Sequence, residues 1–180
     1  MELEEQDKQA RFEELMMPHL DSAFNLARWL TRNEHDAQDV VQEAFLRAYR
    51  FFEGFHGANA RAWLLSIVRN TAYTWLRKNR KHELTTFDLE THDVEDTSPN
   101  AEVLLLKKAD RQELMRAVEE LPVEFRETLI LRELEGMSYK EIAELAEVPI
   151  GTVMSRLARA RKLLQRSLEQ QAVSAAGGVK

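Results

Sequence analysis

The stretch from Ser138 to Arg166 constrains the fold more than any other, because it encodes two helices separated by a tight turn. Ser138 and Glu141 have the spacing of a capping box, in which each side chain satisfies an unpaired amide at the start of a helix. Pro149 follows a short break in the apolar pattern, and proline is well suited to the opening of a helix. We therefore predict a helix-turn-helix.

The second helix of this motif has two chemically different faces. Its buried stripe is expected to be Val153, Leu157, Ala160 and Leu164. Its other side carries the candidate DNA-contacting residues Thr152, Ser155, Arg156, Arg159 and Lys162. From Pro149 to Arg166 there are five Arg or Lys and no acid, which suits the phosphates and base edges of a DNA major groove. The alternative is a solvated basic face on an ordinary helical hairpin.

Length and composition favour two small domains in a cytoplasmic protein. The chain has 180 residues, of which 44% are hydrophobic, and no apolar run approaches the roughly 18 to 20 residues that span a bilayer. The first residues are charged and lack the apolar stretch of a signal peptide. The absence of cysteine fits a reducing compartment. A net charge of −6 indicates that any DNA binding uses local patches or a partner.

The first half of the chain predicts three helices. After a polar lead-in, one helix is expected from Phe12 to Leu30, with Pro18 near its start. Asn33 can cap a second helix that runs to about Phe52. The outer side of this second helix is acidic and polar, with Asp36, Asp39, Gln42, Glu43 and Arg47. A glycine-containing loop over residues 53–59 leads into a third helix at about residues 60–80.

The third helix combines a core stripe with a basic and aromatic face. The stripe is Leu65, Val68, Ala72 and Leu76, and the opposite side is Ser66, Arg69, Asn70, Tyr73, Arg77 and Lys81. Between Gly57 and His82 there are six Arg or Lys and no acid, with Trp63, Tyr73 and Trp75 interleaved. Such a face can hold phosphates while its rings stack on unpaired bases. The alternative is that Trp63 and Trp75 belong to the core.

The remaining segments complete an all-α chain of two small helical domains. Residues 83–106 carry seven acids and no Lys or Arg, which predicts a flexible acidic linker between a first domain at 1–82 and a second at 107–170. Residues 171–180 are expected to form a flexible tail.

The pattern contains no convincing catalytic or metal centre. Glu53 and His56 have a spacing found in carboxylate-bridged metal bundles, but they occur once and in a loop. We therefore expect no enzyme activity and no cofactor. A metal enzyme that uses the acidic face at residues 36–43 is a distant alternative.

Three segments together resemble the bacterial sigma factors of the extracytoplasmic-function group, and the resemblance covers nearly the whole chain. The segment DAQDVVQEAF at residues 36–45 resembles the part of these proteins that binds core RNA polymerase. Residues 61–70, RAWLLSIVRN, resemble the promoter-melting part. Residues 121–126, 141–143 and 151–157 resemble the domain that reads the minus-thirty-five promoter element.

This resemblance implies partners and a role for each candidate residue. Asp39, Gln42 and Glu43 would contact the clamp helices of the largest polymerase subunit, and the beta flap would be a further polymerase contact. Asn70 would receive a base flipped from the minus-ten element, and the other minus-ten DNA-binding candidates are Trp63, Arg69, Tyr73 and Arg77. In the minus-thirty-five domain, Ser155 and Arg159 would read base edges, and Thr152, Arg156 and Lys162 complete the DNA-binding set.

The resemblance also implies regulation and departs from the family at two positions. Relatives are commonly held by an anti-sigma protein, which is often membrane-bound. Met154 and Ala158 stand where relatives often carry a basic and an aromatic residue, so no particular promoter sequence can be transferred to this chain. The main alternative function is a stand-alone helix-turn-helix regulator whose first domain senses a ligand or a protein.

Overall fold

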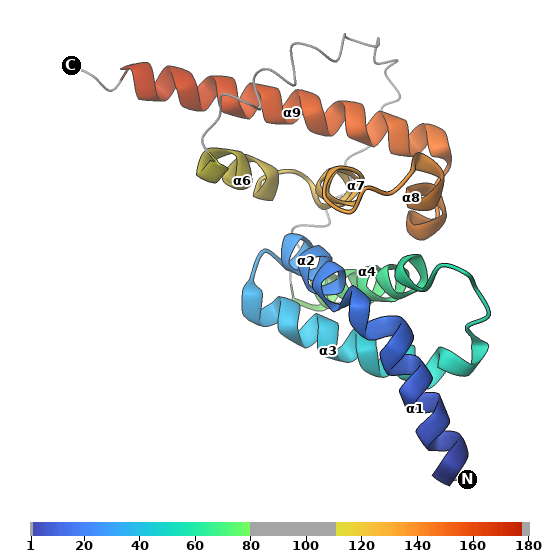
Figure 1. Ribbon diagram of the computed structural model, residues 1–180. Helices are drawn as coiled ribbons and strands as arrows, with labels where there is room; N and C mark the ends of the chain where they lie inside the picture. The colour runs from blue at the N-terminus through green and yellow to red at the C-terminus, as the bar shows by residue number, and fades with distance from the viewer. Residues whose placement is uncertain (1, 80–110, 178–180) are drawn as a thin grey trace.

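The computed structural model describes residues 2–79 and 111–177, and both ranges are helical without a strand, so the predicted all-α class is confirmed (Figure 1). The first lobe contains α1 (Glu2–Met16), η1 (Met17–His19), α2 (Leu20–Thr31), α3 (Glu34–Phe51), η2 (Phe52–Gly54) and α4 (Ala60–Asn79). The second lobe contains α6 (Arg111–Glu119), α7 (Val123–Glu133), α8 (Tyr139–Ala146) and α9 (Ile150–Gly177). The predicted acidic linker lies outside the described residues.

In the first lobe, α2, α3 and α4 pack on one another, and α1 extends from them (Figure 1). The predicted stripe of α4 is fully part of the core, since Leu65, Val68, Ala72 and Leu76 are all buried. The predicted cap of α3 is also present, because the Asn33 side chain accepts a hydrogen bond from the Asp36 amide at 3.0 Å.

The prediction of one helix from Phe12 to Leu30 is wrong, because the helix is interrupted. A 3-10 turn with Pro18 in its first positions separates α1 from α2, because proline has no amide for the helical ladder. The supposed polar lead-in is helical from Glu2. Its ordering comes from contacts with α3 and η2: Tyr49 donates a 2.6 Å hydrogen bond to Glu5, and Lys8 pairs with Glu53 at 3.4 Å.

The second lobe contains the predicted helix-turn-helix. Ser138 and Glu141 form both hydrogen bonds of the capping box at the start of α8. Glu147 ends α8 in the left-handed conformation, with φ of 56°, and α9 begins directly after Pro149. The tail predicted to be flexible at residues 171–180 is helical in its described part, because α9 continues as one helix to Gly177. The alanine-rich end of this segment favours the helical conformation.

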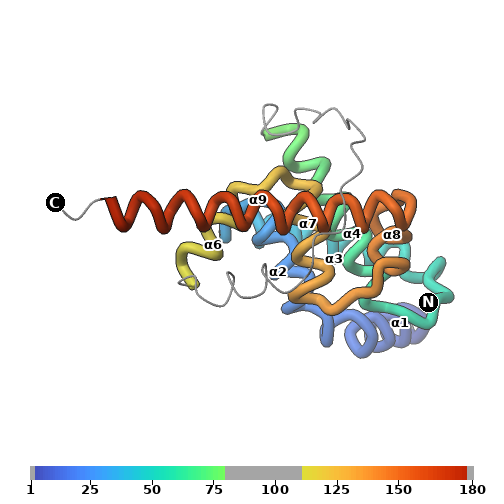
Figure 2. The backbone as a smooth tube through the Cα atoms, turned by 90° about the horizontal axis from the view of Figure 1, so that it is seen from above, coloured from blue at the N-terminus to red at the C-terminus, as the bar shows by residue number. Residues whose placement is uncertain are grey.

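The two lobes are packed against each other, which the sequence did not predict. Helix α2 lies against α7, and α4 lies against α8 (Figures 1 and 2). Arg126 of α7 reaches the first lobe and donates a 3.3 Å hydrogen bond to the carbonyl oxygen of Leu30 near the end of α2. Two peripheral contacts join Arg28 to Glu119 at 3.2 Å and Arg61 to Glu135 at 2.9 Å.

Candidate nucleic-acid interface

The recognition face of α9 is turned away from the first lobe. All four residues of the predicted inner stripe are buried against α6, α7 and α8. Lys162 is exposed, and the other four predicted DNA-contacting residues, Thr152, Ser155, Arg156 and Arg159, are partly exposed. In Figures 1 and 2, α9 lies over the second lobe on the side opposite to the first lobe. Each candidate side chain on α9 therefore keeps some solvent exposure while the lobes are packed together.

Arg156 differs from its neighbours on α9, because its side chain points toward the interior. One guanidinium nitrogen, Nη1, is buried without a hydrogen-bond partner. Burial raises the pKa of Glu127 in α7, and the charge of Arg156 is one of the weaker effects that oppose this rise. The structure thus places Arg156 at the edge of the recognition face, where its charge acts on the lobe interior.

The predicted minus-ten face of α4 is divided between the lobe interface and solvent. Arg69 forms an ion pair with Glu127 of α7, and the Tyr73 hydroxyl donates a 2.9 Å hydrogen bond to the same carboxylate. Asn70 and Arg77 are exposed. Trp63 is half-buried, with its ring 4.9 Å from that of Phe55. Arg69 and Tyr73 therefore do not lie on an open face, contrary to expectation.

Burial shapes the electrostatics around Glu127, whose side chain has no solvent exposure. Burial raises the pKa of Glu127, although the charge and hydrogen bonds of Arg69 act in the opposite direction. Burial, followed by the charge of Glu127, raises the pKa of Tyr73 well above its ordinary value. For Arg69, burial lowers the pKa, but Glu127 outweighs it and the pKa is raised overall. Tyr73 therefore acts as a neutral hydrogen-bond donor and Arg69 as a fixed cation.

Sequence reasoning missed Glu127 and Arg126 as residues that connect the lobes. Both are almost completely buried, and Arg126 donates hydrogen bonds of 2.8 Å and 2.7 Å to the carbonyl oxygens of Glu119 and Leu121. The available signal was their position: the two adjacent charged residues follow Phe125 on α7 and precede Thr128 and an apolar run that begins at Leu129. Charged residues are rarely buried unless they have partners, so this position indicates a specific contact.

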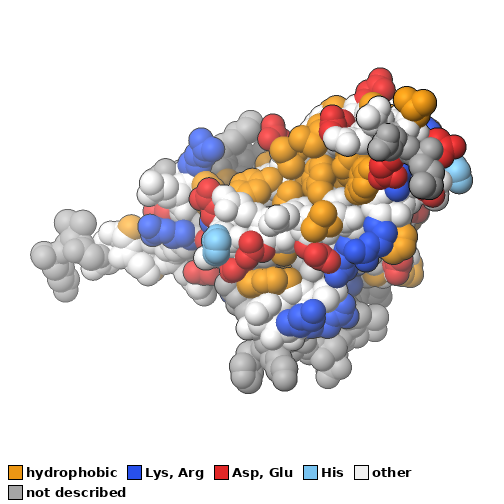
Figure 3. Space-filling view, turned by 90° about the horizontal axis from the view of Figure 1, so that it is seen from below, with side chains coloured by type: hydrophobic (Ala, Val, Ile, Leu, Met, Phe, Trp, Pro, Cys, Tyr) orange, Lys and Arg blue, Asp and Glu red, His pale blue; other side chains and the backbone are white. Residues whose placement is uncertain are grey.

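The acidic stripe on α3 is exposed, as predicted. Asp39, Gln42 and Glu43 all face solvent, and Glu43 pairs with Arg47 one turn later at 2.7 Å. An apolar groove runs beside this stripe, between α2 and α3, and is lined by Met17, Leu20, Phe24, Val41 and Phe45 together with Gln38, Gln42 and Asp21. In the view from the first-lobe side, apolar side chains gather in one area with charged groups around it (Figure 3).

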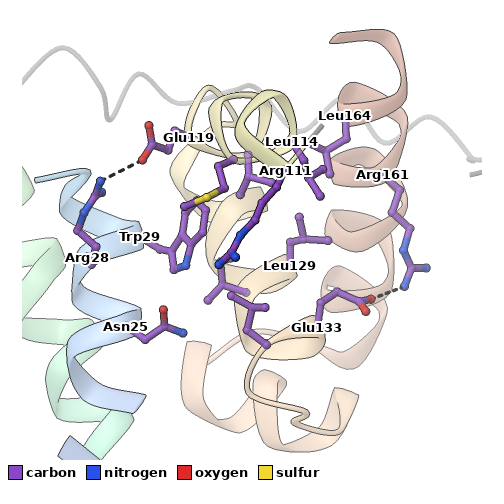
Figure 4. A pocket seen from close by; sticks show the side chains of 14 residues that line it. Asn25, Arg28, Trp29, Arg111, Leu114, Glu119, Leu129, Glu133, Arg161 and Leu164 are labelled. Atoms are coloured by element: carbon purple, nitrogen blue, oxygen red, sulfur yellow. Dashed lines mark hydrogen bonds and ion pairs between the residues drawn. The ribbon is translucent and has the colours of Figure 1, made fainter. Parts of the chain in front are cut away.

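A second hollow lies between the lobes, with a volume of about 700 Å³ (Figure 4). Trp29 of α2 faces Leu114, Leu129 and Leu164 of the second lobe across it. Two ion pairs lie at its edge, Arg28 with Glu119 and Arg161 with Glu133, and Arg111 is a further charged residue of its lining. The hollow is thus mainly apolar.

Two negative findings apply to the described ranges. No helix within residues 2–79 and 111–177 is long and apolar enough to cross a membrane. The same ranges contain no group of three or more His, Asp or Glu side chains placed to share a metal ion.

The two lobes correspond to two parts of one class of transcription factor. Residues 15–82 match the family model "Sigma-70 region 2", and residues 111–164 match "Sigma-70, region 4". The chain is 36% identical to the ECF RNA polymerase sigma-E factor of Haemophilus influenzae over 153 residues, which cover 80% of this chain and 79% of that protein. It is 38% identical to the Escherichia coli sigma-E factor over 143 residues, 74% of each chain. The chain therefore belongs to the ECF family of RNA polymerase sigma factors, and it is an alternative sigma factor that directs transcription from specific promoters.

Solved structures agree with this assignment. The sigma factor RpoE of Bartonella quintana, solved in complex with the anti-sigma factor NepR, has a TM-score of 0.68 and 28% identity and covers 88% of this chain and 97% of its own. CnrH, solved in complex with the cytosolic domain of CnrY, has a TM-score of 0.63 and 25% identity, with 90% of each chain covered. The match to region 2 assigns the first lobe to this family as well. A stand-alone helix-turn-helix regulator would not require a region 2 lobe.

Proposed function

We propose that this chain recruits core RNA polymerase to promoters through three separate surfaces. The exposed stripe of Asp39, Gln42 and Glu43 docks on the clamp helices of the largest polymerase subunit, and the second lobe meets the beta flap. The recognition face of α9 reads the minus-thirty-five element. The α4 face captures a flipped minus-ten base at Asn70. The observation that carries this proposal is that one chain combines an open, acid-free recognition face on α9 with an exposed carboxylate-bearing surface on the other lobe.

Base capture would drive strand opening by binding alone. Flipping a base costs a few kcal/mol of unstacking, and a pocket that holds the extruded base can offset this cost. Asn70 is exposed, and Phe55 in the loop that precedes α4 contacts the Trp63 ring at a tilt of 41°. No covalent step is assigned to the chain, because polymerase forms the phosphodiester bonds. The protein is therefore proposed to act without enzyme activity or cofactor.

The packed arrangement of the lobes is proposed to be a closed state that opens at the promoter. Arg69 and Tyr73 are candidates for contacts with minus-ten DNA, but both are engaged by Glu127. The Glu127 carboxylate occupies the position that a DNA phosphate would take against Arg69. Polymerase and DNA contacts together would replace the contacts between the lobes.

An anti-sigma protein is the proposed regulator, as in the RpoE–NepR and CnrH–CnrY complexes. The apolar groove between α2 and α3 overlaps the polymerase-binding stripe at Gln42, so a protein bound there would compete with polymerase. In many relatives such a protein is membrane-bound. The chain itself would remain in the cytoplasm, where polymerase and promoter DNA are found.

Run-off transcription tests the proposed function directly. Purified chain is added to bacterial core polymerase on genomic fragments whose transcripts appear when the protein is overproduced. A sigma factor gives transcripts with defined start points, and their production depends on the added chain. A stand-alone regulator would bind DNA but would give no start point with core polymerase, and it would not co-migrate with core polymerase in gel filtration.

A further inference from the structure

The first two turns of α9 expose large apolar side chains where a helix in water would normally carry polar groups. Ile150 is 46% exposed and Met154 is 53% exposed, although the helix buries a complete apolar stripe elsewhere. Because the two residues are four positions apart, their side chains lie next to each other on one face, with about 5 to 6 Å between their Cβ atoms. They form a small apolar patch that the fold does not use.

The position of this patch indicates what contacts it. Residues at the beginning of the second helix of a helix-turn-helix meet the base edges in the major groove. Ser155 follows Met154 directly, and from Pro149 to Arg166 the chain carries five cations and no acid. The patch is therefore continuous with the DNA-facing surface, and its charged surroundings favour a polyanion.

The backbone beside the patch also permits close approach. Gly151 is exposed, and a Cβ atom added there would meet nothing within 4 Å. The missing side chain leaves room for the helix to enter the groove deeply between Ile150 and Met154. Ile150 and Met154 are exposed while the lobes are packed, and the main packing partners of α9 are α6, α7 and α8.

The chemistry of the major groove leaves one partner for an apolar side chain. Base edges there present hydrogen-bond donors and acceptors, apart from the C5-methyl group of thymine. The Met154 thioether is a flexible apolar group that can follow the position of a methyl group, and it forms only weak hydrogen bonds. At a base edge without a methyl group, Met154 would displace water from polar atoms without replacing the hydrogen bonds that this water made.

We propose that Met154, supported by Ile150, determines promoter specificity by contacting thymine methyl groups in the minus-thirty-five element. This inference rests on the proposed function of α9 and adds the class of base that this face selects. Arg159 and Ser155 would read polar edges, whereas Met154 would require a thymine on one strand at the adjacent position.

Replacement of thymine by deoxyuridine tests the proposal, because it removes only the methyl group. Holoenzyme assembled from core polymerase and the full chain first selects its preferred sequence from duplexes randomised over the minus-thirty-five window. Each thymine on either strand of the selected sequence is then replaced in turn. Loss of one buried methyl contact should weaken binding about fourfold at one or two positions. Holoenzyme with Met154→Ala should bind the thymine duplex more weakly by a similar factor and should show no preference for thymine over uracil there.

Met115→Ala is the matched control, since Met115 is a methionine of similar exposure, 42%, on α6. This variant should keep the full thymine preference. The inference is overturned if no thymine in the selected sequence is sensitive to deoxyuridine, or if Met154→Ala keeps the preference of the unmodified chain. If no sequence is selected at all, the proposed minus-thirty-five function of α9 fails, and the inference fails with it.

Discussion

The two helix faces predicted to bind DNA, on α9 and on α4, differ in their contacts with the other lobe. The candidate side chains on the recognition face of α9 are all at least partly exposed, whereas on the α4 face Arg69 and Tyr73 contact a buried carboxylate of the other lobe. This difference shows that a basic and aromatic helix face in the sequence does not indicate by itself that the face is accessible to DNA. If the α4 face binds DNA as proposed, Arg69 and Tyr73 must first leave Glu127.

The largest expected effect comes from holding the lobes together. Asn25 and Glu135 hydrogen-bond across the interface at 3.1 Å, and the chain has no cysteine of its own. We expect Asn25→Cys with Glu135→Cys, joined by a short reductant-cleavable bismaleimide, to abolish run-off transcription while binding to minus-thirty-five DNA persists. Cleavage of the linker should restore transcripts. The double variant without linker is the control. Transcription that continues with the link intact would show that opening is not required.

The next largest effect concerns the Arg69–Glu127 pair itself. Removing one partner of a buried ion pair costs about 3 to 5 kcal/mol, because the other charge remains buried without compensation. Glu127→Ala should therefore lower the free energy of unfolding by this amount in denaturant titration. Glu133→Ala removes the partially exposed partner of Arg161 and should cost less than about 1 kcal/mol. A double-mutant cycle of Arg69→Ala and Glu127→Ala isolates the contact between the lobes, and a coupling energy near zero would contradict the closed state as described.

The sequence predicted the helices better than it predicted their packing. The periodicity of α4 separated its core stripe correctly, and the capping residues Asn33 and Ser138 placed the starts of α3 and α8. These features are local, so they are encoded within a few residues. The partner of Arg69 lies 58 positions away, and periodicity contains no information about it. The roles of the candidate site residues in binding DNA and polymerase stay predictions.

An intermediate effect is expected on the open face. Arg159→Ala should cost about 1 to 3 kcal/mol for the selected minus-thirty-five sequence and little on unrelated DNA, if this side chain reads a base edge. Fluorescence anisotropy with both duplexes over a range of salt concentrations measures these terms. A uniform loss on all DNA with a shallower salt dependence would instead identify a phosphate contact.

A similar effect is expected for polymerase binding, which should not depend on lobe opening. Gln42→Ala with Glu43→Ala should weaken the affinity for core polymerase by more than about 1 kcal/mol, if these side chains belong to the centre of the interface. The fold should be intact, because both residues are exposed. Glu34→Ala, an exposed acid at the first turn of the same helix, is the control. Unchanged affinity in the double variant would refute the assignment of this stripe.

The smallest effect belongs to the capping box, which lies where the helix-turn-helix meets the first lobe. Ser138→Ala should lower the free energy of unfolding by about 1 kcal/mol at neutral pH, because one amide at the start of α8 loses its partner. The hydrogen bond from the Ser138 amide lowers the pKa of Glu141, and the Ser138 hydroxyl, Arg61 and Asn59 act in the same direction.

A carboxylate whose pKa is lower in the folded state stabilises the protein above its unfolded pKa, here near 4.5, and this contribution is lost as the pH falls through the folded value. Glu141→Gln should therefore reduce the loss of unfolding free energy as the pH falls from the unfolded to the folded pKa of Glu141. Ser138→Ala should lower the free energy of unfolding at every pH. The Ser138 amide contributes most to this lowered pKa, and Arg61 and Asn59 of the first lobe add smaller effects. Acid titration curves of unfolding that are identical for Glu141→Gln and the unmodified chain would show that folding does not lower the pKa of this carboxylate.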